Sequence, residues 1–418
     1  MELKKGYKQT EVGVIPDEWK LMSINQIFEF HSTSNYSKAE MLSDGAIGCF
    51  HYGLIHSLPN NNYDIRTGVK YFVTKQQAKY EFIKEGDVVM VDASEDLSGV
   101  NKSIEISGVQ DKLYISGLHT FLLRDRGFFE KYFRGPILNS YFTKAQFYRL
   151  AVGMKVFGVS KQQLKTVLLP IPTKSEQTAI ANALSDTDSY ITSLEKLIEK
   201  KRQIKQGAMQ ELLKPKDSWE TKHLGDIGKT FGGLSGKSKD DFTEGVYPYI
   251  PFMNIMSNPI IDTEYFDYVN LDSGESQNLA LKGDLFFNGS SETPEEVGMC
   301  SVLLNDIPNL YLNSFCFGFR IKSELKINGL YLSYYFRSKE GRKLFFSMAQ
   351  GATRYNLSKS NFNKLKVPIP TIEEQNVIAE RLFDLDSDIK IHEVKLGKVK
   401  FIKQGMIQNL LTGKIRLI

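Results

Sequence analysis

The segment FGGLSGKS at 231–238 carries the residue types of a phosphate-binding loop. In the P-loop pattern G-x-x-x-x-G-K-[ST], backbone amides and the lysine hold phosphate oxygens, and a helix begins at the Lys-Ser step. Gly236, Lys237 and Ser238 match the end of this pattern, but Phe231 stands at the position of its first glycine. The stretch that follows, KDDFTEGVYPYI, is too short and too rich in turn residues for such a helix. We therefore expect a flexible polar loop rather than an ATP site.

Two other groups of residues have side chains suited to metal or acid–base chemistry. CFHYGLIH offers Cys49, His51 and His56 as ligands, but no fourth ligand is evident, so loop and core positions are the simpler interpretation. SETPEE at 291–296, which recurs weakly as SEDLSG at 94–99, is more typical of a solvated loop than of a catalytic pair. The chain also lacks a G-x-S-x-G elbow and an Asn-Pro-Pro-Tyr-like stretch of an amino-methyltransferase. We therefore predict no catalytic residue and no metal site in this chain.

The composition is that of an ordinary soluble protein with more than one domain. The 418 residues exceed one typical core, and 41% of them are apolar and 24% charged. The net charge of +4 is compatible with nucleic acid but is not evidence for it. Cys49, Cys300 and Cys316 are scattered and odd in number, so a reducing cytoplasm is the simplest compartment. The sequence has neither an apolar run near the roughly 18 residues of a membrane span nor, in MELKKGYKQTEVGVIP, a signal-peptide core.

The chain contains an internal repeat with a period near 200 residues. GVSKQQLKTVLLPIPTKSEQTAIANALSDTDSYI at 158–191 is matched by NLSKSNFNKLKVPIPTIEEQNVIAERLFDLDSDI at 356–389, at an offset of 198 without a gap. Solenoid repeats have periods of about 20–50 residues, so this pattern indicates two whole domains in tandem.

The repeat continues upstream of this segment. GDVVMV at 86–91 matches GDLFFN at 283–288, and Trp19 pairs with Trp219. At the same spacing FGGLSGKS falls on HSTSNYSK at 31–38, which has no glycine, and this argues further against a P-loop.

A long helix is predicted at the end of each half. After the extended PIP segments, Thr173 with Glu176 and Thr371 with Glu374 have the spacing of a capping box, in which the two side chains satisfy each other's backbone N–H groups. The helices are expected at 174–213 and 372–412, roughly 60 Å each.

Apolar residues in both helices recur in alternating steps of four and three, a heptad seam typical of a coiled coil. Gly413 is expected to cap the second helix, and the polar seam residues Thr187, Lys201, Lys205, His392 and Lys403 to fix register. The alternative is two separate amphipathic helices, each on its own domain. The apolar pairing residues are Ile180, Leu184, Ile191, Leu194, Ile198, Leu212, Ile378, Leu382, Leu385, Ile389, Leu396, Met406 and Leu410.

The regions before the helices have the pattern of mixed α/β domains. GDVVMV, HTFLLR, GDLFFN and FGFRI predict strands, and RGPILNSYFTKAQFYRL and NGLYLSYYFRSKEGRKLFF predict helices. The loops at 31–80 and 232–280 match only at scattered positions. One frame carrying different loops suggests two different readings of one kind of ligand.

With these repeats the chain resembles the specificity subunit of Type I restriction–modification systems. The resemblance rests on PIPTKSEQTAIA and PIPTIEEQNVIA, the QGATRYNLSK step, the paired Gly-Asp strands, the opening TEVGVIPDEW and the closing LLTGKIRLI. VGMKVFGVSK departs from the usual Gly-Ser/Ala-Thr step, so the corresponding loop of the first half is less well defined. The implied order is a target-recognition domain at 1–172, a spacer helix at 173–214, a second such domain at 215–370, and a second helix with a tail at 371–418.

The resemblance implies a DNA-binding subunit without catalysis of its own. Each domain would read half of a split double-stranded DNA site, and the antiparallel helices would set the spacing. Two methyltransferase subunits would dock beside the helices, bring S-adenosylmethionine and methylate adenine N6. Separate restriction subunits would bring ATP, Mg²⁺ and the nuclease.

Polar residues of the variable loops are the candidates for DNA contacts, since Asn and Gln suit adenine and Arg and Lys suit guanine or phosphate. In this interpretation FGGLSGKS is a DNA-contacting loop whose Lys237 meets phosphate. Two alternatives remain open: a stand-alone DNA-modifying or DNA-cleaving enzyme, and a structural coiled-coil adaptor. The predicted DNA-binding residues are Asn35, Tyr36, Lys38, Arg66, Lys70, Ser235, Lys237, Ser238, Lys239 and Asn254.

Overall fold

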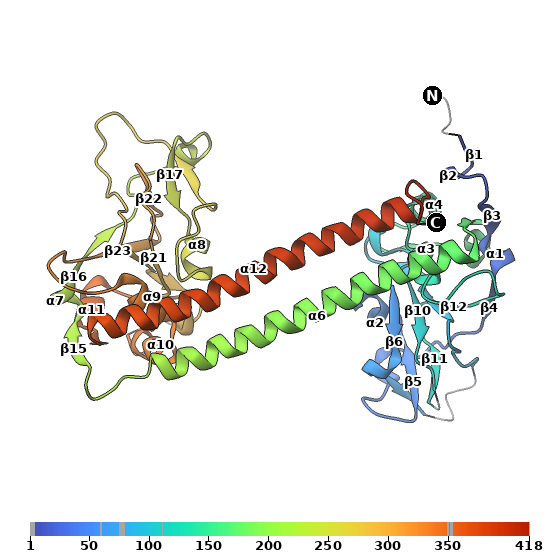
Figure 1. Cartoon of the computed structure of the whole chain (residues 1–418), viewed down its shortest axis with the longest axis horizontal. Helices are drawn as coiled ribbons and strands as arrows, with labels where there is room; N and C mark the ends of the chain where they lie inside the picture. The colour runs from blue at the N-terminus through green and yellow to red at the C-terminus, as the bar shows by residue number, and fades with distance from the viewer. Residues whose placement is uncertain are drawn as a thin grey trace. The chain divides into compact units, whose positions relative to one another are not determined.

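The computed structural model describes residues 5–58, 61–74, 80–110, 112–348, 351 and 354–417. The chain forms two compact units: Met1–Glu195 with Val394–Ile418, and Lys196–Glu393. Each unit contains one globular domain together with one part of each long helix (Figure 1).

Two sheets form the frame of the first domain. The larger has the order β4 (Phe28–His31), β12 (Thr120–Asp125), β8 (Val88–Val91), β10 (Ser103–Ser107) and β6 (Asn62–Asp64), and only β10 with β6 is parallel. The smaller has the order β11 (Leu113–Ser116), β5 (Ile47–Phe50) and β7 (Phe72–Val73). The central strand β8 is buried throughout, and its alternating side chains enter two cores, Val88 and Met90 on one face and Val89 and Val91 on the other.

The second domain repeats this frame. Its larger sheet has the order β16 (Gly228–Gly232), β23 (Cys316–Ile321), β19 (Leu285–Asn288) and β21 (Cys300–Val302), and its smaller sheet β18 (Asp267–Val269), β17 (Tyr247–Ile250) and β22 (Tyr311–Leu312). The strand β19 corresponds to β8, with Leu285 and Phe287 in one core and Phe286 in the other. The strands predicted from GDVVMV, HTFLLR, GDLFFN and FGFRI are thereby confirmed.

Short helices and two-stranded pairs complete both domains. In the first domain, 134–150 forms α3 (Arg134–Leu138) and α4 (Tyr141–Leu150), and in the second, 328–346 forms α9 (Gly329–Arg337) and α10 (Lys339–Phe346), as predicted. The other short helices are α1 (Ile24–Ile27), α2 (Tyr52–Ser57), α5 (Lys161–Thr166), α7 (Leu224–Ile227), α8 (Phe252–Ser257), α11 (Lys359–Lys364), η1 (Lys38–Glu40), η2 (Ile65–Thr67), η3 (Leu97–Gly99), η4 (Lys239–Phe242) and η5 (Pro294–Glu296). The strand pairs are β1 (Tyr7–Thr10) with β2 (Gly13–Pro16), β3 (Lys20–Ser23) with β14 (Leu168–Ile171), β9 (Ala93–Ser94) with β13 (Phe157–Gly158), β15 (Glu220–His223) with β25 (Lys366–Ile369), and β20 (Ser290–Ser291) with β24 (Tyr355–Asn356).

The structural repeat extends through the loops that the sequence left unmatched. Within 31–80 and 232–280, β5 corresponds to β17, α2 to α8 and η1 to η4, each in the same order. Different side chains build the same backbone elements there, because a strand or a short helix constrains burial pattern more than residue identity.

The helices α6 (Lys174–Leu212) and α12 (Ile372–Leu410) lie at the predicted positions. The backbone N–H of Glu176 donates to Thr173 Oγ1 at 3.4 Å, and that of Glu374 to Thr371 Oγ1 at 3.3 Å, which confirms both threonines as caps. The glutamates do not complete the predicted capping boxes. Each carboxylate instead accepts from a tryptophan Nε1, Glu176 from Trp19 at 2.7 Å and Glu374 from Trp219 at 3.1 Å.

The neighbouring glutamines also join each helix to its domain. Gln177 accepts from the backbone of Glu130 and donates to Pro172, and Gln375 accepts from Asn328 and donates to Pro370. Both glutamine side chains are buried. The repeated Glu-Gln dipeptide is therefore the joint between globular domain and helix.

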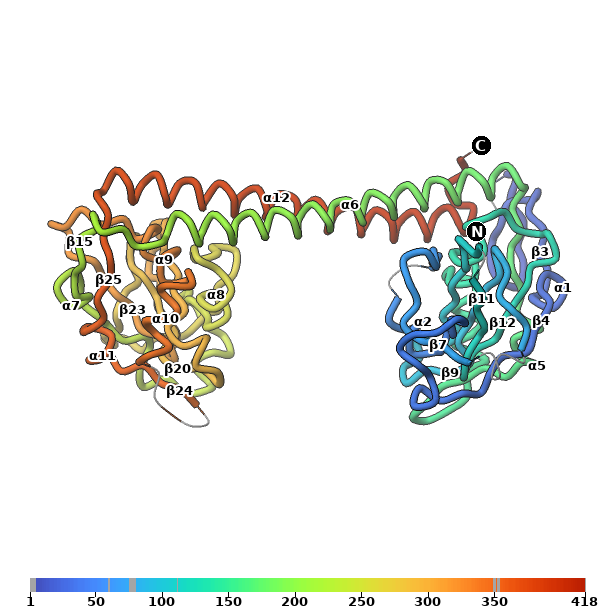
Figure 2. The backbone as a smooth tube through the Cα atoms, turned by 90° about the horizontal axis from the view of Figure 1, so that it is seen from below, coloured from blue at the N-terminus to red at the C-terminus, as the bar shows by residue number. Residues whose placement is uncertain are grey.

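The two helices pair antiparallel within each unit (Figure 2). In the first unit Lys403 pairs with Asp188, and Lys400 with Glu195 at 2.7 Å. In the second unit Arg202 pairs with Glu393 at 2.6 Å, and Lys205 with Asp386. From Asp188 to Lys205 along α6, the partner residues on α12 run in the opposite direction, from Lys403 to Asp386. The predicted antiparallel coiled coil is therefore confirmed.

Apolar seam residues join these helix pairs to the domain cores. Ile180 and Leu184 belong to a core with Leu410, and Ile378 and Leu382 to a core with Leu213. All the predicted apolar pairing residues are buried or half-buried. Gly413, with φ +67°, ends α12 as expected.

The long helices carry many charged residues along their exposed faces. In the part of the chain that the structure describes, no helix combines the length and the apolarity that crossing a bilayer requires.

Candidate nucleic-acid interface

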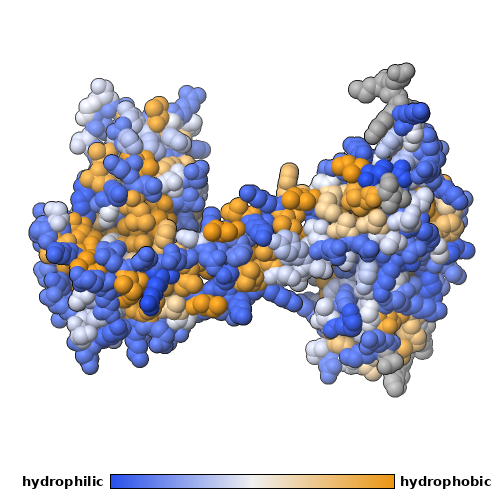
Figure 3. Space-filling view, in the orientation of Figure 1, coloured by the Kyte–Doolittle hydropathy of each residue, from blue (hydrophilic) through white to orange (hydrophobic). Residues whose placement is uncertain are grey.

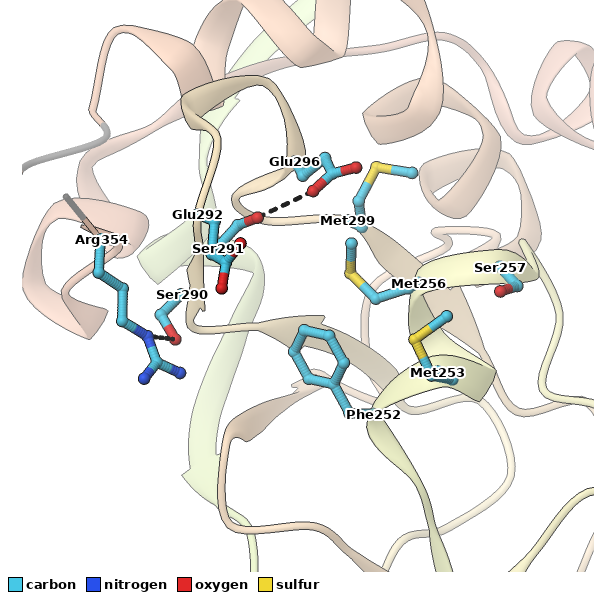
Figure 4. Close-up of a pocket in the computed structure, with 10 residues that line it drawn as sticks. All are labelled: Phe252, Met253, Met256, Ser257, Ser290, Ser291, Glu292, Glu296, Met299 and Arg354. Carbon is cyan, nitrogen blue, oxygen red and sulfur yellow. Dashed lines mark hydrogen bonds between the residues drawn. The ribbon is translucent and has the colours of Figure 1, made fainter. Parts of the chain in front are cut away.

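A cleft of about 970 Å³ opens in the second domain between α8, the loop from β20 through η5, and the residues before β24 (Figure 4). We call it the arginine cleft. One wall is apolar and the other carries hydroxyl, carboxylate and guanidinium groups. Its lining residues are Phe252, Met253, Met256, Ser257, Ser290, Ser291, Glu292, Glu296, Met299 and Arg354.

The polar wall of the arginine cleft is held by short-range contacts. The strand β20 pairs with β24 so that Ser290 lies opposite Asn356, which places Arg354 beside the loop. Arg354 Nε donates to Ser290 Oγ at 3.2 Å, and Ser291 Oγ donates to Glu296 at 3.0 Å. The guanidinium is thus fixed at its inner nitrogen.

A second cleft, of about 670 Å³, adjoins the arginine cleft and shares Phe252 and Met253 with it. We call it the aromatic cleft. Phe242 and Tyr249 meet edge to face there, with ring centroids 5.5 Å apart, and the Phe315 side chain is 61% exposed. Rings exposed beside lysines suit contact with bases and phosphates. Its lining residues are Lys237, Ser238, Lys239, Phe242, Tyr249, Pro251, Phe252, Met253, Tyr265, Asp267, Asn313, Ser314 and Phe315.

The first domain has a cleft at the position equivalent to the arginine cleft. We call it the first-domain cleft, and its volume is about 480 Å³. It lies between α2, the loop from β9 through η3, and the residues before β13, which correspond to α8, β20–η5 and β24. The lining differs: Tyr52 replaces Phe252, His56 replaces Met256, and Val156 replaces Arg354. The remaining lining residues are Gly53, Ala93, Ser94, Glu95, Asp96 and His119.

Two histidines of the first-domain cleft are held by polar contacts. His56 Nε2 lies 3.3 Å from the carbonyl oxygen of Ala93, and His119 Nδ1 lies 3.2 Å from Asp92 Oδ1. The side chain of His119 is about half exposed and carries a positive φ of 56° at the turn before β12. The equivalent clefts of the two domains are thus lined by imidazoles in the first domain and by a guanidinium in the second.

Three of the predicted second-domain residues, Lys237, Ser238 and Lys239, line the aromatic cleft. Ser238 caps η4, and its backbone N–H and hydroxyl hold the pKa of Asp241 below its usual range. Lys239 is exposed. Only η4, a single turn of four residues, follows the loop, which differs from the strand–loop–helix arrangement of a P-loop.

Lys237 makes a different contact from the predicted one. Its side chain is only 6% exposed, and the ammonium pairs with Glu275 and lies 3.9 Å from Asp241. This pairing raises the pKa of Lys237, and it lowers the pKa of Glu275 to about 2. Lys237 therefore braces the loop, whereas Lys239 is the lysine of this segment that is open to a phosphate.

The other two predicted residues of the second domain lie outside both clefts. Ser235 is exposed, and its backbone exchanges hydrogen bonds with the amide of Gln277. Asn254 is completely buried, and its amide donates to the carbonyl oxygens of Asp262 and Tyr265. Asn254 thus holds the loop after α8 and is not open to a base in this structure.

The predicted first-domain residues do not line the first-domain cleft. Asn35 accepts from Tyr80, and Tyr36 packs edge to face on the same Tyr80 ring at 6.2 Å. Burial and this neighbour raise the pKa of Tyr36. Lys38 Nζ lies 5.7 Å from the centre of the Tyr71 ring. These three residues gather beside the smaller sheet.

The remaining two first-domain residues lie apart from that group. Arg66 follows β6 in η2 and forms an ion pair with Asp64 at 2.5 Å, which raises the pKa of Arg66. Lys70 is exposed between η2 and β7.

The residues considered for metal chemistry have structural contacts. Cys49 and Ser34 approach each other, with Sγ and Oγ 3.9 Å apart, and burial raises the Cys49 pKa to about 11. His51 Nδ1 accepts from the N–H of Gly53 and caps α2. Within the described part of the chain, no three His, Cys, Asp or Glu side chains are arranged to hold a metal ion.

The sequence interpretation missed both equivalent clefts. Their signals were present: SETPEE and SEDLSG form the same loop, and the QGATRYNLSK and VGMKVFGVSK steps supply Arg354 and Val156. The sequence does not connect each loop with its step, because only the strand pairing of β20 with β24 and of β9 with β13 brings the two together.

Comparison with known proteins identifies the family. The family described as type I restriction modification DNA specificity domain matches the chain twice, at residues 16–206 and 216–400. The chain belongs to this family. Each match covers one globular domain and most of the long helix that follows it.

Relatives of this DNA specificity chain are similar over most or nearly all of its length. A protein named as the MjaX specificity subunit of a type I restriction enzyme from Methanocaldococcus jannaschii is 25% identical, over 99% of this chain and 97% of its own. The MjaVIII specificity subunit from the same organism is 28% identical, over 63% of this chain and 66% of its own. The crystal structure of a Type I restriction–modification S subunit from M. genitalium has the same fold, with a TM-score of 0.56 at 17% identity over 98% of both chains.

Proposed function

We propose that this chain is the sequence-specific DNA-binding subunit of a type I restriction–modification complex, and that each domain reads one half of a bipartite site. The observation that carries the proposal is the duplicated frame with equivalent clefts of different lining. A shared frame presents each cleft in the same way, and the different side chains favour different bases.

The long helices are proposed to set the spacing of the half-sites and to bind two methyltransferase subunits. Apolar side chains stand on their exposed faces (Figure 3). In the first unit Phe401 is 76% exposed, and in the second unit Ile391 is 65% exposed. Exposed apolar side chains that gather into a patch mark a surface that binds a protein partner.

Chemistry is assigned to the partner subunits. Methyltransferase subunits would bring S-adenosylmethionine and methylate adenine N6, and restriction subunits would bring ATP, Mg²⁺ and the nuclease. This chain supports the assignment of ATP to a partner through Lys237, the lysine that matches the P-loop pattern. Lys237 pairs with Glu275 and therefore points inward. A cytoplasmic location follows from this role.

Reconstitution with and without partners tests the proposal. The purified chain is incubated with DNA and S-adenosylmethionine, first alone and then with a type I methyltransferase subunit from the same host. We expect adenine methylation at one bipartite motif only in the mixture. Methylation or cleavage by the chain alone would favour a stand-alone enzyme, and the absence of any salt-sensitive DNA binding in the mixture would favour a structural adaptor.

A further inference from the structure

Arg354 lines the arginine cleft, and its geometry there suits the recognition of a base. The Ser290 hydroxyl accepts from its Nε at 3.2 Å, and β24 begins directly after it at Tyr355. Among the residues that the structure describes, none pairs with its two terminal amino groups. Figure 4 shows these two amino groups beyond the Ser290 contact. An arginine held at Nε with both terminal groups unused keeps the pair of parallel donors that guanine O6 and N7 accept.

The surroundings of Arg354 favour a base over a phosphate. Glu292 and Glu296 line the same cleft, and their carboxylates would repel a phosphate that entered it. A carboxylate is also the acceptor that matches the N4 amino group of cytosine, the partner of guanine. The apolar wall of Phe252 and Met253 offers a surface on which the face of a base can pack beside the polar groups.

We propose that Arg354 is a specificity-determining residue that recognises a guanine of the second half-site in the major groove. This inference rests on the proposed function. Val156 stands at the equivalent position of the first domain, so that domain lacks this contact at the equivalent base pair and reads it through other groups of its cleft.

The experiment compares three variants in the complete methyltransferase complex. Arg354→Ala removes the guanidinium, Arg354→Lys keeps the charge without the paired donors, and Lys326→Ala removes one exposed charge of the same domain outside both clefts. Binding is measured to the recognised site and to every single-base change of it, at several salt concentrations.

For both Arg354 variants we expect discrimination at one G·C pair of the second half-site to fall about 10- to 100-fold. Discrimination in the first half-site is expected to remain, which also shows that the variant is folded. Lys326→Ala is expected to leave every preference unchanged.

Three results would overturn the proposal. A uniform loss over all sequences, with a salt slope reduced by about 1 for Arg354→Ala, would make the contact a phosphate contact. Unchanged preferences would make Arg354 a solvated side chain. A loss of discrimination in the first half-site would mean that Arg354 affects the domain that does not contain it. If the unchanged complex recognised no bipartite site, the proposed function itself would fail, and this outcome is separate from all three.

Discussion

Replacement of Glu176 by glutamine is expected to destabilise the first unit far more than the same change at Glu374 destabilises the second. The Glu176 carboxylate is fully buried, accepts from Trp19, and pairs with Arg416, whose Nη2 is 2.9 Å from Oε2. Glutamine keeps an acceptor for Trp19 but leaves the guanidinium without its buried partner.

The expected loss of unfolding free energy follows from how exposed the two partners of each ion pair are. Removing one partner of a buried ion pair costs about 3–5 kcal/mol. The Arg416 side chain is 23% exposed and also contacts Glu18 at 3.0 Å, so we expect a smaller loss, about 2–3 kcal/mol. Glu374 is 30% exposed and its partner Lys216 is 57% exposed, so Glu374→Gln should cost about 0.5 kcal/mol.

The chain provides its own reporters, because its two tryptophans lie one in each unit and each contacts one of these glutamates. Urea unfolding is followed by fluorescence, with Trp219→Phe isolating Trp19 and Trp19→Phe isolating Trp219. Glu176→Gln should lower the Trp19 midpoint by about 1 M, whereas Glu374→Gln should barely move the Trp219 midpoint. Equal shifts at both sites, or no shift for Glu176→Gln, would refute the reasoning from burial.

Three further predictions concern the loop, its pH dependence and the helices. In the assembled complex, Lys239→Ala should lower the salt slope of DNA binding by about 1, whereas Lys237→Ala should leave the slope unchanged and lower the melting temperature. The pKa of Glu275 in the folded chain is about 2, below its unfolded value, so its contribution to stability is present above about pH 4.5 and lost as the pH falls through 2. Calorimetry should therefore show a lower melting temperature for Glu275→Gln than for the unchanged chain above pH 4.5, with the two converging towards pH 2. Removing one heptad from each long helix shortens it by about 10 Å and should shorten the preferred spacer by about two or three base pairs, with both half-sites unchanged in a methylation assay.

The frame of the molecule was predictable from sequence because its signals are local and occur twice. Heptad spacing, the threonine caps and the Gly-Asp strands each depend on neighbouring residues, and each of these patterns occurs in both halves of the chain. The role of Glu176 was not predictable in this way. Its spacing from Thr173 matches a capping box, but tertiary contacts with Trp19 and Arg416 take the carboxylate instead.

The candidate interface was harder to predict from sequence because it depends on contacts between residues that are distant in the chain. Lys237 was chosen for its charge, and only the fold brings Glu275 to it. Asn254 was chosen for its amide, which the loop after α8 consumes. Arg354 lies within a repeated step, but the sequence does not single it out, because Ser290 reaches it only through the pairing of β20 with β24.

Methylome sequencing of host cells tests the central claim most directly. Three strains are compared: one with this gene, one without it, and one in which 232–280 is replaced by the equivalent loops of another specificity subunit. We predict a bipartite adenine-methylated motif that disappears without the gene, and that changes in one half only after the replacement. A motif that persists without the gene, or two halves that change together, would contradict the account.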